Sequence, residues 1–412
     1  MNLFVTLGKA LADRGHHVTF FGISDIAEKV RGSGLDCRHL EPDSAPVGTL
    51  SSVIRSMGDA RGIRSLKIQQ RFDSLRSAGI LEKGPKLVKE AKVEALVIDQ
   101  AEACGGSLAE FLNLPWVTVC SALCLNSEPQ VPPFFTPWNY ATSNVAVARN
   151  QFAYATARLA TRAAQSLINR YRKNLGLPPF GRLDDTFSPF AQICQQNQEF
   201  DFPRKQLPKC FHYVGPIRAP AFTCEFPWDR LDGRPLIYAS LGTLFNQHRY
   251  MYRIIAEACA GLNAQLVLSL GGGAEADEYS HLPGSPLVVK FAPQRELLAR
   301  ATLTITHAGL NTTLESLNEG VPLVAVPITS EQPAIAARIR WTGTGDFIGL
   351  SHLTAKRLRL LIERVLGNAD YRHAAQRMKA AIRQTHGTAR AVEIIEEVIR
   401  TQQPVLAAAL EI

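Results

Sequence analysis

The sequence predicts an α/β protein with two doubly wound domains, each built around its own parallel sheet and facing the other across a cleft. Its 412 residues are more than one hydrophobic core usually holds, which suggests two domains of about 150 to 200 residues each. In both halves, short apolar runs bounded by turn residues alternate with helical stretches, as in parallel sheets. With 46% hydrophobic and 20% charged residues, the composition is that of an ordinary globular protein.

The first half opens with an amphipathic helix over residues 1–14, which ends at Gly15. Apolar runs at 18–21, 95–98 and 116–119 predict strands, with a helix over 105–111 between the last two. A doubly wound domain normally begins with a strand, and that strand lies centrally in the sheet. We therefore expect that the first strand is missing from this chain, that the true start lies upstream, and that the neighbouring strands have unpaired edges.

Residues 131–138 are rich in proline and aromatic residues and interrupt this alternation. Beside the carboxyl edge of a sheet, Phe134, Phe135 and Trp138 could form the apolar wall of an acceptor site, or they could only pack in the core. A long helical pattern follows to about residue 174 and mixes arginines with apolar residues. It predicts either a solvated helix face or contact with a membrane surface.

The second half has a regular pattern, with strands expected at 236–241, 265–270, 287–290, 303–306 and 321–326. We divide the chain into an acceptor-binding domain at 1–215, a linker at 216–234 and a second domain at 235–385. The last segment, 386–412, contains a helix that could pack back on the first domain.

Bulk properties narrow the function classes. No apolar run reaches the roughly 18 to 20 residues that span a bilayer, and no signal pattern opens the chain, which favours the cytoplasm with, at most, peripheral contact at the inner membrane face. The eight cysteines are too sparse for a disulfide framework and lack zinc-site spacing. The formal charge of +8 is dispersed, which argues against nucleic-acid binding. No sequence feature indicates an obligate protein partner.

The segment 303–315 combines a strand, a tight turn and the start of a helix. Such a turn offers free backbone N–H groups and the positive end of the helix dipole to a phosphate. His307, Thr312 and Thr313 add donors, and Glu315 lies one turn further along, within reach of a ribose. Glycine turns at 240–243 and 271–273 follow neighbouring strands, and the three turns together indicate a nucleotide site.

Several motifs in order carry a resemblance to a known family. Phe-Ala-Pro-Gln at 291–294 is followed by Thr-His-Ala-Gly-Leu-Asn-Thr-Thr-Leu-Glu-Ser-Leu at 306–317 and Gly-Val-Pro-Leu-Val-Ala-Val-Pro at 320–327, with Glu331 and Gln332 after them. This pattern resembles the UDP-glycosyltransferases, glycosyltransferase family 1, especially their bacterial carotenoid (zeaxanthin) and macrolide branches. The resemblance implies the two-domain GT-B fold, with the sugar donor bound in the C-terminal domain.

The resemblance also implies roles for individual residues. Phe291 would stack on uracil beside Gln294, Glu315 would bind the ribose, and Glu331 and Gln332 would bind the sugar. The diphosphate would lie in the turns and at the helix start, where the implied contacts are Gly242, Thr243, His307, Gly309, Asn311 and Thr312. Leu310 stands where plant members have Trp, so the fit on that side of the sugar differs.

Asp99 ends the apolar strand at 95–98 and could be the N-cap of the next helix. The resemblance instead implies that it orients a catalytic His, which is absent from this chain. It further implies inverting transfer of a hexose, with glucose as the expected sugar, from a UDP-sugar to a hydroxyl of a carotenoid, terpenoid or polyketide. No Asp-x-Asp motif is present, so we expect no metal and no cofactor beyond the co-substrate. The alternative is an inactive sugar-nucleotide-binding remnant.

Overall fold

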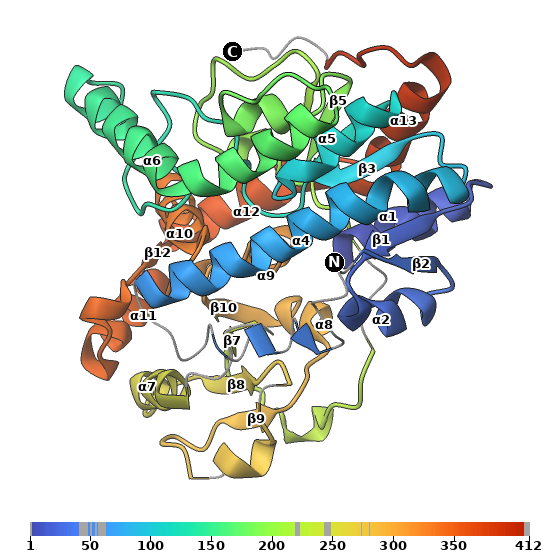
Figure 1. Cartoon of the computed structure of the whole chain (residues 1–412). Coiled ribbons are helices and arrows are strands. Elements are labelled where there is room, and N and C mark those ends of the chain that lie inside the picture. The colour runs from blue at the N-terminus through green and yellow to red at the C-terminus, as the bar shows by residue number, and fades with distance from the viewer. Residues whose placement is uncertain are drawn as a thin grey trace.

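The computed structural model contains two α/β halves, with helix α4 (Ile63–Glu90) crossing between them (Figure 1). The residues that the structure describes are 2–40, 48–49, 52–53, 56, 63–218, 223–242, 249–272, 274–279 and 281–407. Thr243, which was predicted to contact the diphosphate, lies outside them.

The C-terminal half contains a six-stranded, all-parallel sheet, as the alternating pattern predicted. Its order is β12-β11-β10-β7-β8-β9. The strands are β7 (Leu236–Ser240), β8 (Gln265–Ser269), β9 (Leu287–Val289), β10 (Ala301–Thr306), β11 (Leu323–Ala325) and β12 (Gly345–Phe347). The chain order reverses between β7 and β10, and in open α/β sheets ligands bind at such a point, beside the carboxyl ends of the strands.

Helices cover both faces of this sheet. One face buries Ile255 of α7 (Arg249–Cys259) and Leu361 of α11 (Ala355–Gly367) against Leu268. The other face buries α9 (Leu310–Glu319), α10 (Gln332–Trp341) and α12 (Ala369–Arg383) in a second cluster. The short helix α8 (Gln294–Leu298) follows β9. Because both faces are covered, β7, β9 and β11 are apolar almost throughout. Strand β10 instead alternates apolar residues with threonines, of which Thr304 and Thr306 are fully buried.

The N-terminal half has its parallel strands in two separate sheets. Four strands lie in the order β3 (Leu96–Asp99), β4 (Trp116–Cys120), β5 (Ala191–Cys194) and β6 (Phe211–Tyr213). The other two are β1 (Thr19–Gly22) and β2 (Asp36–His39), which pair only with each other among the described strands. The helices of this half are α1 (Asn2–Ala12), α2 (Ala27–Arg31), α4, α5 (Ala103–Leu112) and α6 (Asn144–Asn174).

The last helix, α13 (Gly387–Thr401), returns to the N-terminal half and packs on α1 and on the sheet through Ile394, Ile395 and Val398. Two glycines, Gly215 and Gly387, lie where the segment that leads into α13 packs closely against the start of the linker. A Cβ at Gly387 would lie 2.0 Å from the carbonyl oxygen of Pro216, and one at Gly215 would lie 2.0 Å from Oγ1 of Thr385. The two passages of the chain therefore lie side by side.

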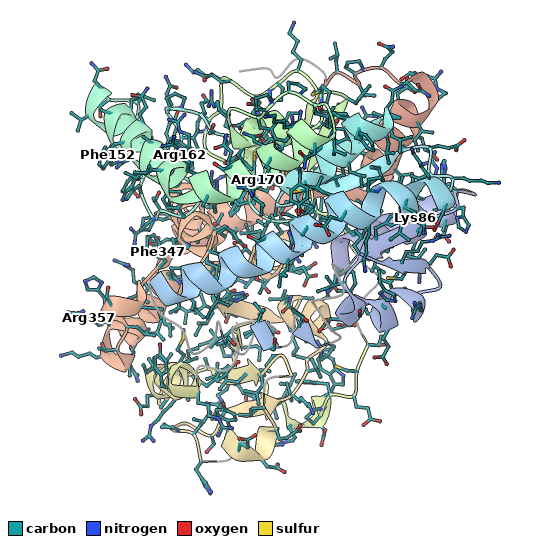
Figure 2. All side chains as sticks on the ribbon, viewed as in Figure 1. Lys86, Phe152, Arg162, Arg170, Phe347 and Arg357 are labelled. Atoms are coloured by element: carbon teal, nitrogen blue, oxygen red, sulfur yellow. The ribbon has the colours of Figure 1, made fainter. Side chains whose placement is uncertain are left out.

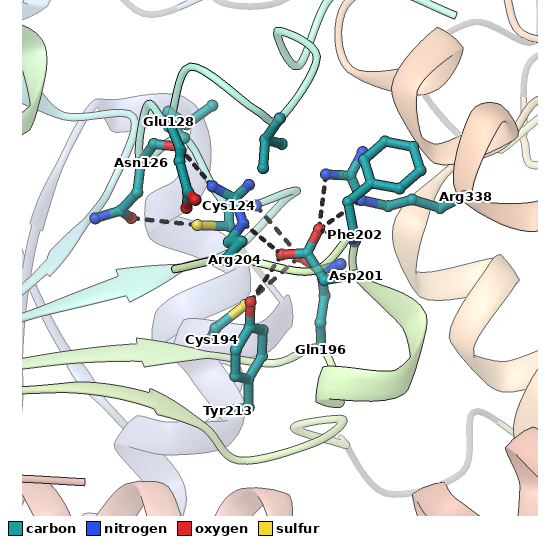
Figure 3. Close-up of polar contacts among 12 residues, drawn as sticks. Cys124, Asn126, Glu128, Cys194, Gln196, Asp201, Phe202, Arg204, Tyr213 and Arg338 are labelled. Atoms are coloured by element: carbon teal, nitrogen blue, oxygen red, sulfur yellow. Dashed lines mark hydrogen bonds and ion pairs between the residues drawn. The ribbon is translucent and has the colours of Figure 1, made fainter. Parts of the chain in front are cut away.

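A buried ion cluster joins the two halves (Figure 3). Asp201 follows the 3₁₀ turn η3 (Gln198–Phe200) and accepts hydrogen bonds from Arg204 at 2.7 Å and from the hydroxyl of Tyr213 at 2.8 Å. Arg338 on α10 reaches the same carboxylate at 2.7 Å, and its guanidinium lies 4.2 Å from the centre of the Phe202 ring. Both side chains of this interdomain pair are almost fully buried, so the charge of Arg338 is compensated by a carboxylate of the other half.

Helix α6 carries exposed apolar and basic side chains together. Val145, Phe152 and Leu159 are 80%, 72% and 69% exposed. Figure 2 shows Phe152, Arg162 and Arg170 along this helix, and its sequence from 144 to 174 contains no Asp or Glu. Within the described ranges, no helix combines the length and hydrophobicity that crossing a membrane requires. Contact of α6 with a membrane surface stays a prediction.

Candidate functional site

The centre of the candidate site is the turn between β10 and α9, where His307 lies between two glycine turns. A Cβ at Gly242 would come within 2.7 Å of the imidazole Cε1, and one at Gly309 within 2.6 Å of Nε2. Gly242 also has a φ of +76°, a backbone conformation that side-chain-bearing residues rarely adopt. Ala308, fully buried between the two, adopts a φ of +64° without being glycine. Such local strain is characteristic of functional turns.

Burial governs the chemistry of His307. The residue is 9% exposed, and burial lowers the pKa of its imidazole to about 4, with the Ser240 backbone opposing this shift in part. The ring is therefore neutral at pH 7 and offers one N–H donor. Its Nδ1 and the hydroxyl of the neighbouring Thr306 have no hydrogen-bond partner among the described residues, and the same holds for the Thr313 hydroxyl. The turn thus concentrates uncommitted polar groups at the start of α9.

Helix α9 begins at this turn, with Gly309 as its N-cap residue and no side-chain cap. The first N–H groups of a helix have no partner within it, and together with the helix dipole they favour an anion. Thr312 lies on this first turn and is 9% exposed, whereas Asn311 is exposed. The structure therefore brings His307, Gly309, Asn311 and Thr312 together, with Gly242 opposite.

Glu315 is held in place by a polar network. Its Oε2 accepts a 2.5 Å hydrogen bond from Nε2 of Gln294, whose Oε1 accepts one of 3.0 Å from the hydroxyl of Tyr238. Arg295 adds an ion pair to Glu315 at 3.5 Å. Gln294 was predicted to lie beside the base. In this structure its side chain also positions Glu315, the predicted ribose ligand.

Phe291, three residues before Gln294, supplies an exposed aromatic face. The ring is 43% exposed, and it lies so close to Gly272 that a Cβ at Gly272 would come within 2.5 Å of its Cζ. Gly272 follows β8 and has a φ of +82°. An exposed aromatic ring of this kind is suited to stacking on a nucleobase.

Glu331 and Gln332 lie where α10 begins, beyond β11 and at the same edge of the sheet. Oε1 of Gln332 accepts hydrogen bonds from the backbone N–H groups of Ile328 at 2.8 Å and Thr329 at 3.0 Å. This leaves its amide NH₂ as the group that could donate to a ligand. Burial raises the pKa of the Glu331 carboxyl. Both residues follow β11, which neighbours β10 in the sheet, and their contact with the sugar stays a prediction.

Asp99 ends β3 at the carboxyl edge of the N-terminal sheet. Its Oδ2 accepts a 2.7 Å hydrogen bond from Ser121, and its Oδ1 accepts one of 3.0 Å from the N–H of Ala101. The N-cap of α5 is Glu102, so Asp99 caps the preceding turn rather than the helix. No described histidine hydrogen-bonds to Asp99.

Two residues that the sequence analysis missed connect Asp99 to the C-terminal half. Nε2 of Gln195 donates to the carbonyl of Ser121 at 2.6 Å and to Oδ1 of Asn311 at 3.2 Å. A continuous path therefore runs from Asp99 through Ser121 and Gln195 to the start of α9. Ser121 and Gln195 are the first residues after β4 and β5, and the rule that ligands bind at carboxyl strand ends would have found them.

The three predicted acceptor-site aromatics do not form one wall. Phe134 packs edge-on against Phe135, with ring centres 5.4 Å apart, and also against the apolar cluster around α9 and α10. Phe135 is 38% exposed. Trp138 instead lies under the guanidinium of Arg149 on α6, at 4.5 Å. Their contact with an acceptor stays a prediction, for which Phe134 at the interdomain boundary has the best placement.

Metal-ligating residues do not gather in the described part of the chain, where no three of the types His, Cys, Asp and Glu form a possible metal site. All eight cysteines are free.

The two facing α/β halves, with polar groups at the carboxyl ends of both sheets, define a two-domain nucleotide-binding protein. The model of the UDP-glucoronosyl and UDP-glucosyl transferase family matches residues 81–403. The chain belongs to that family and is a glycosyltransferase.

Similar proteins match nearly the whole chain and support this family assignment. A zeaxanthin glucosyltransferase from Pantoea ananas is 36% identical over 410 residues, 97% of this chain and 93% of that protein. One from Pseudescherichia vulneris is 31% identical over 406 residues, 97% and 95% of the two chains. The calicheamicin glycosyltransferase CalG4 has a TM-score of 0.72 at 20% identity, over 97% of this chain and 95% of that one. It shares the GT-B fold, which confirms the predicted fold class.

Proposed function

We propose that this protein transfers a hexose from a UDP-sugar to a hydroxyl group of a lipophilic small molecule, with glucose as the expected hexose. The observation that carries the proposal is the set of groups that follow the carboxyl ends of neighbouring strands in the C-terminal sheet: Phe291 and Gln294 after β9, the His307 turn and Glu315 after β10, and Glu331 and Gln332 after β11. We assign them to the base, to the diphosphate and ribose, and to the sugar, respectively. The zeaxanthin glucosyltransferase relatives favour a hydroxylated carotenoid as acceptor, with terpenoids and polyketides as further candidates.

In this proposal, the start of α9 binds the diphosphate with its free N–H groups, and His307 adds a neutral donor. The acceptor oxygen forms a bond to the anomeric carbon from the face opposite UDP, the bond from that carbon to the diphosphate breaks, and the configuration inverts. The diphosphate leaves with the bonding electrons, and the helix dipole stabilises its developing charge. We propose that no metal is needed for this stabilisation.

The acceptor proton must move to a base, and Asp99 is placed to orient one at the carboxyl edge of β3. Because no described histidine hydrogen-bonds to Asp99, a protein that binds the sugar nucleotide without transferring the sugar is the second candidate. The path through Ser121 and Gln195 to Asn311 favours transfer, since it holds the proposed acceptor side against the donor side.

Incubation with UDP-glucose, UDP-galactose and zeaxanthin, followed by mass detection, tests the proposal. We expect a product heavier than zeaxanthin by one or two hexoses, formed at the same rate with EDTA present. Loss of turnover in EDTA that Mg²⁺ or Mn²⁺ restores would contradict the metal-independent step. UDP binding without any product, across a panel of hydroxylated acceptors, would establish the binding-only candidate.

A further inference from the structure

Helix α6 carries the three most exposed large apolar side chains of the described chain. These are Val145, Phe152 and Leu159, each more exposed than any other large apolar side chain there. They are spaced seven residues apart, about two helical turns, so they form one stripe along the helix. A contiguous apolar stripe that faces solvent, unlike single scattered residues, indicates a surface that binds another molecule.

The opposite side of α6 is fixed to the N-terminal half. Asn150 and Ala153 are buried there. The Asn150 amide donates a 3.1 Å hydrogen bond to the carbonyl of Pro129. The hydroxyl of Tyr154 donates one of 3.1 Å to the carbonyl of Val131. Figure 1 shows that the first part of α6 projects from the body of the molecule, so the stripe is held outward on an anchored helix.

Uncompensated positive charge accompanies the stripe. The sequence of α6 has six basic residues and no Asp or Glu. One of them, Arg172, is buried and paired with Glu110 at 2.8 Å, so its charge is neutralised within the fold. Four others are exposed and form no ion pair with any described residue: Arg158, Arg162, Arg170 and Lys173. Figure 2 shows Arg162 and Arg170 on the same helix as Phe152.

We propose that α6 docks on the surface of a bilayer that contains anionic lipids. The helix lies in the plane of the surface, with the stripe at the boundary between headgroups and acyl chains. Its long basic side chains reach the anionic headgroups. A bilayer surface of this kind offers apolar depth and negative charge side by side, which are the two features that α6 presents. The inference does not depend on the proposed function.

A second copy of this chain suits the stripe less well. Two α6 helices packed stripe to stripe would bring two sets of uncompensated basic side chains together, and like charges across an interface are unfavourable. The three side chains also supply far less area than the roughly 800 Å² per partner that a stable protein interface buries. Charge and area therefore both favour the lipid surface.

Flotation of the purified full chain with vesicles, without donor or acceptor, tests the proposal. One set of vesicles contains phosphatidylcholine with phosphatidylglycerol, and the other contains phosphatidylcholine alone. We expect about hundredfold or more tighter binding to the anionic vesicles, because each exposed basic side chain near such a surface strengthens binding several-fold.

Two double variants separate the contributions of charge and stripe. Arg158→Gln with Arg162→Gln should weaken binding to the anionic vesicles about twentyfold or more. Phe152→Ser with Leu159→Ser should weaken it about tenfold or more, because the apolar area can no longer leave water. All four side chains are exposed, so the thermal midpoint should stay that of the wild type.

Helix α11 provides the matched controls. Lys356→Gln with Arg357→Gln removes the same net charge from exposed positions there, and Leu360→Ser removes an exposed apolar side chain. Neither control should change vesicle binding.

Equal binding to the two kinds of vesicle, or equal weakening by the α11 charge control, would overturn the inference. Sedimentation velocity without vesicles tests the second copy. A dimer that Phe152→Ser with Leu159→Ser dissociates, together with no vesicle binding, would show that α6 is an interface between copies and that the bilayer proposal is wrong.

Discussion

Replacing Asp201 with Asn is expected to lower the free energy of unfolding by about 3 to 5 kcal/mol, because breaking one side of a buried ion pair leaves uncompensated charge. Burial by itself would raise the pKa of Asp201, but the Arg204 and Arg338 guanidinium groups outweigh it and hold that pKa well below its usual range. Asp201 therefore stays ionised at pH 5 to 8, and the loss should appear in full there.

Urea unfolding at pH 7 measures this effect. Asp346 provides the matched control, since it also accepts from two arginines, Arg340 at 2.6 Å and Arg364 at 2.5 Å, but these are 42% and 57% exposed. Asp346→Asn should therefore cost only about 0 to 1 kcal/mol. Equal losses for the two variants would show that the Asp201 cluster does not hold the halves together. Arg338→Met should also destabilise, since it removes the partner from the C-terminal half.

The loss of folding stability at acidic pH is expected to depend on His307. Its pKa lies near 4 in the folded protein instead of 6.5, so below pH 6.5 the unfolded chain takes up a proton that the folded chain does not. Folding stability attributable to this residue is therefore intact above pH 6.5 and falls by about 3 kcal/mol as the pH drops to about 4. His307→Gln should remove that part of the pH dependence.

The free energies of unfolding of the wild type and of His307→Gln are measured between pH 7 and 4 and compared. His281→Gln, at an exposed position, controls for loss of an imidazole as such. Parallel pH profiles for wild type and His307→Gln would mean that burial does not keep this ring neutral.

The strand, turn and helix start around His307 could be predicted because they are contiguous in sequence. Strand β10, the His307 turn and the start of α9 occupy one short segment, so a strand pattern, a glycine turn and helix-start donors could be recognised together. Strands β2, β5, β6 and β12 were missed because each is short and its apolar residues are interrupted by a polar or charged one. In β5 the apolar pattern is interrupted by Gln192, which is buried because its side chain accepts a 2.9 Å hydrogen bond from Asn126.

Long-range pairs could not be predicted from local patterns. Asp201 and Arg338 are 137 residues apart, and nothing near either residue indicates the other. Gln195 and Asn311, 116 residues apart, meet only because both follow strand ends that face each other across the two halves. A cavity that β1 and β3 line could not be predicted either, because its lining residues are spread along the chain from Phe4 to Ile399.

Calorimetric titration of the full chain with UDP tests the central claim most directly, because it asks whether the nucleotide lies where Glu315 and His307 meet the start of α9. Glu315→Gln and His307→Gln should each weaken UDP binding by about 1.5 to 3 kcal/mol, roughly ten- to 150-fold. Glu319→Gln, the same change at the far end of α9, should leave affinity unchanged. Wild-type affinity in both the Glu315 and His307 variants would contradict the proposed donor site.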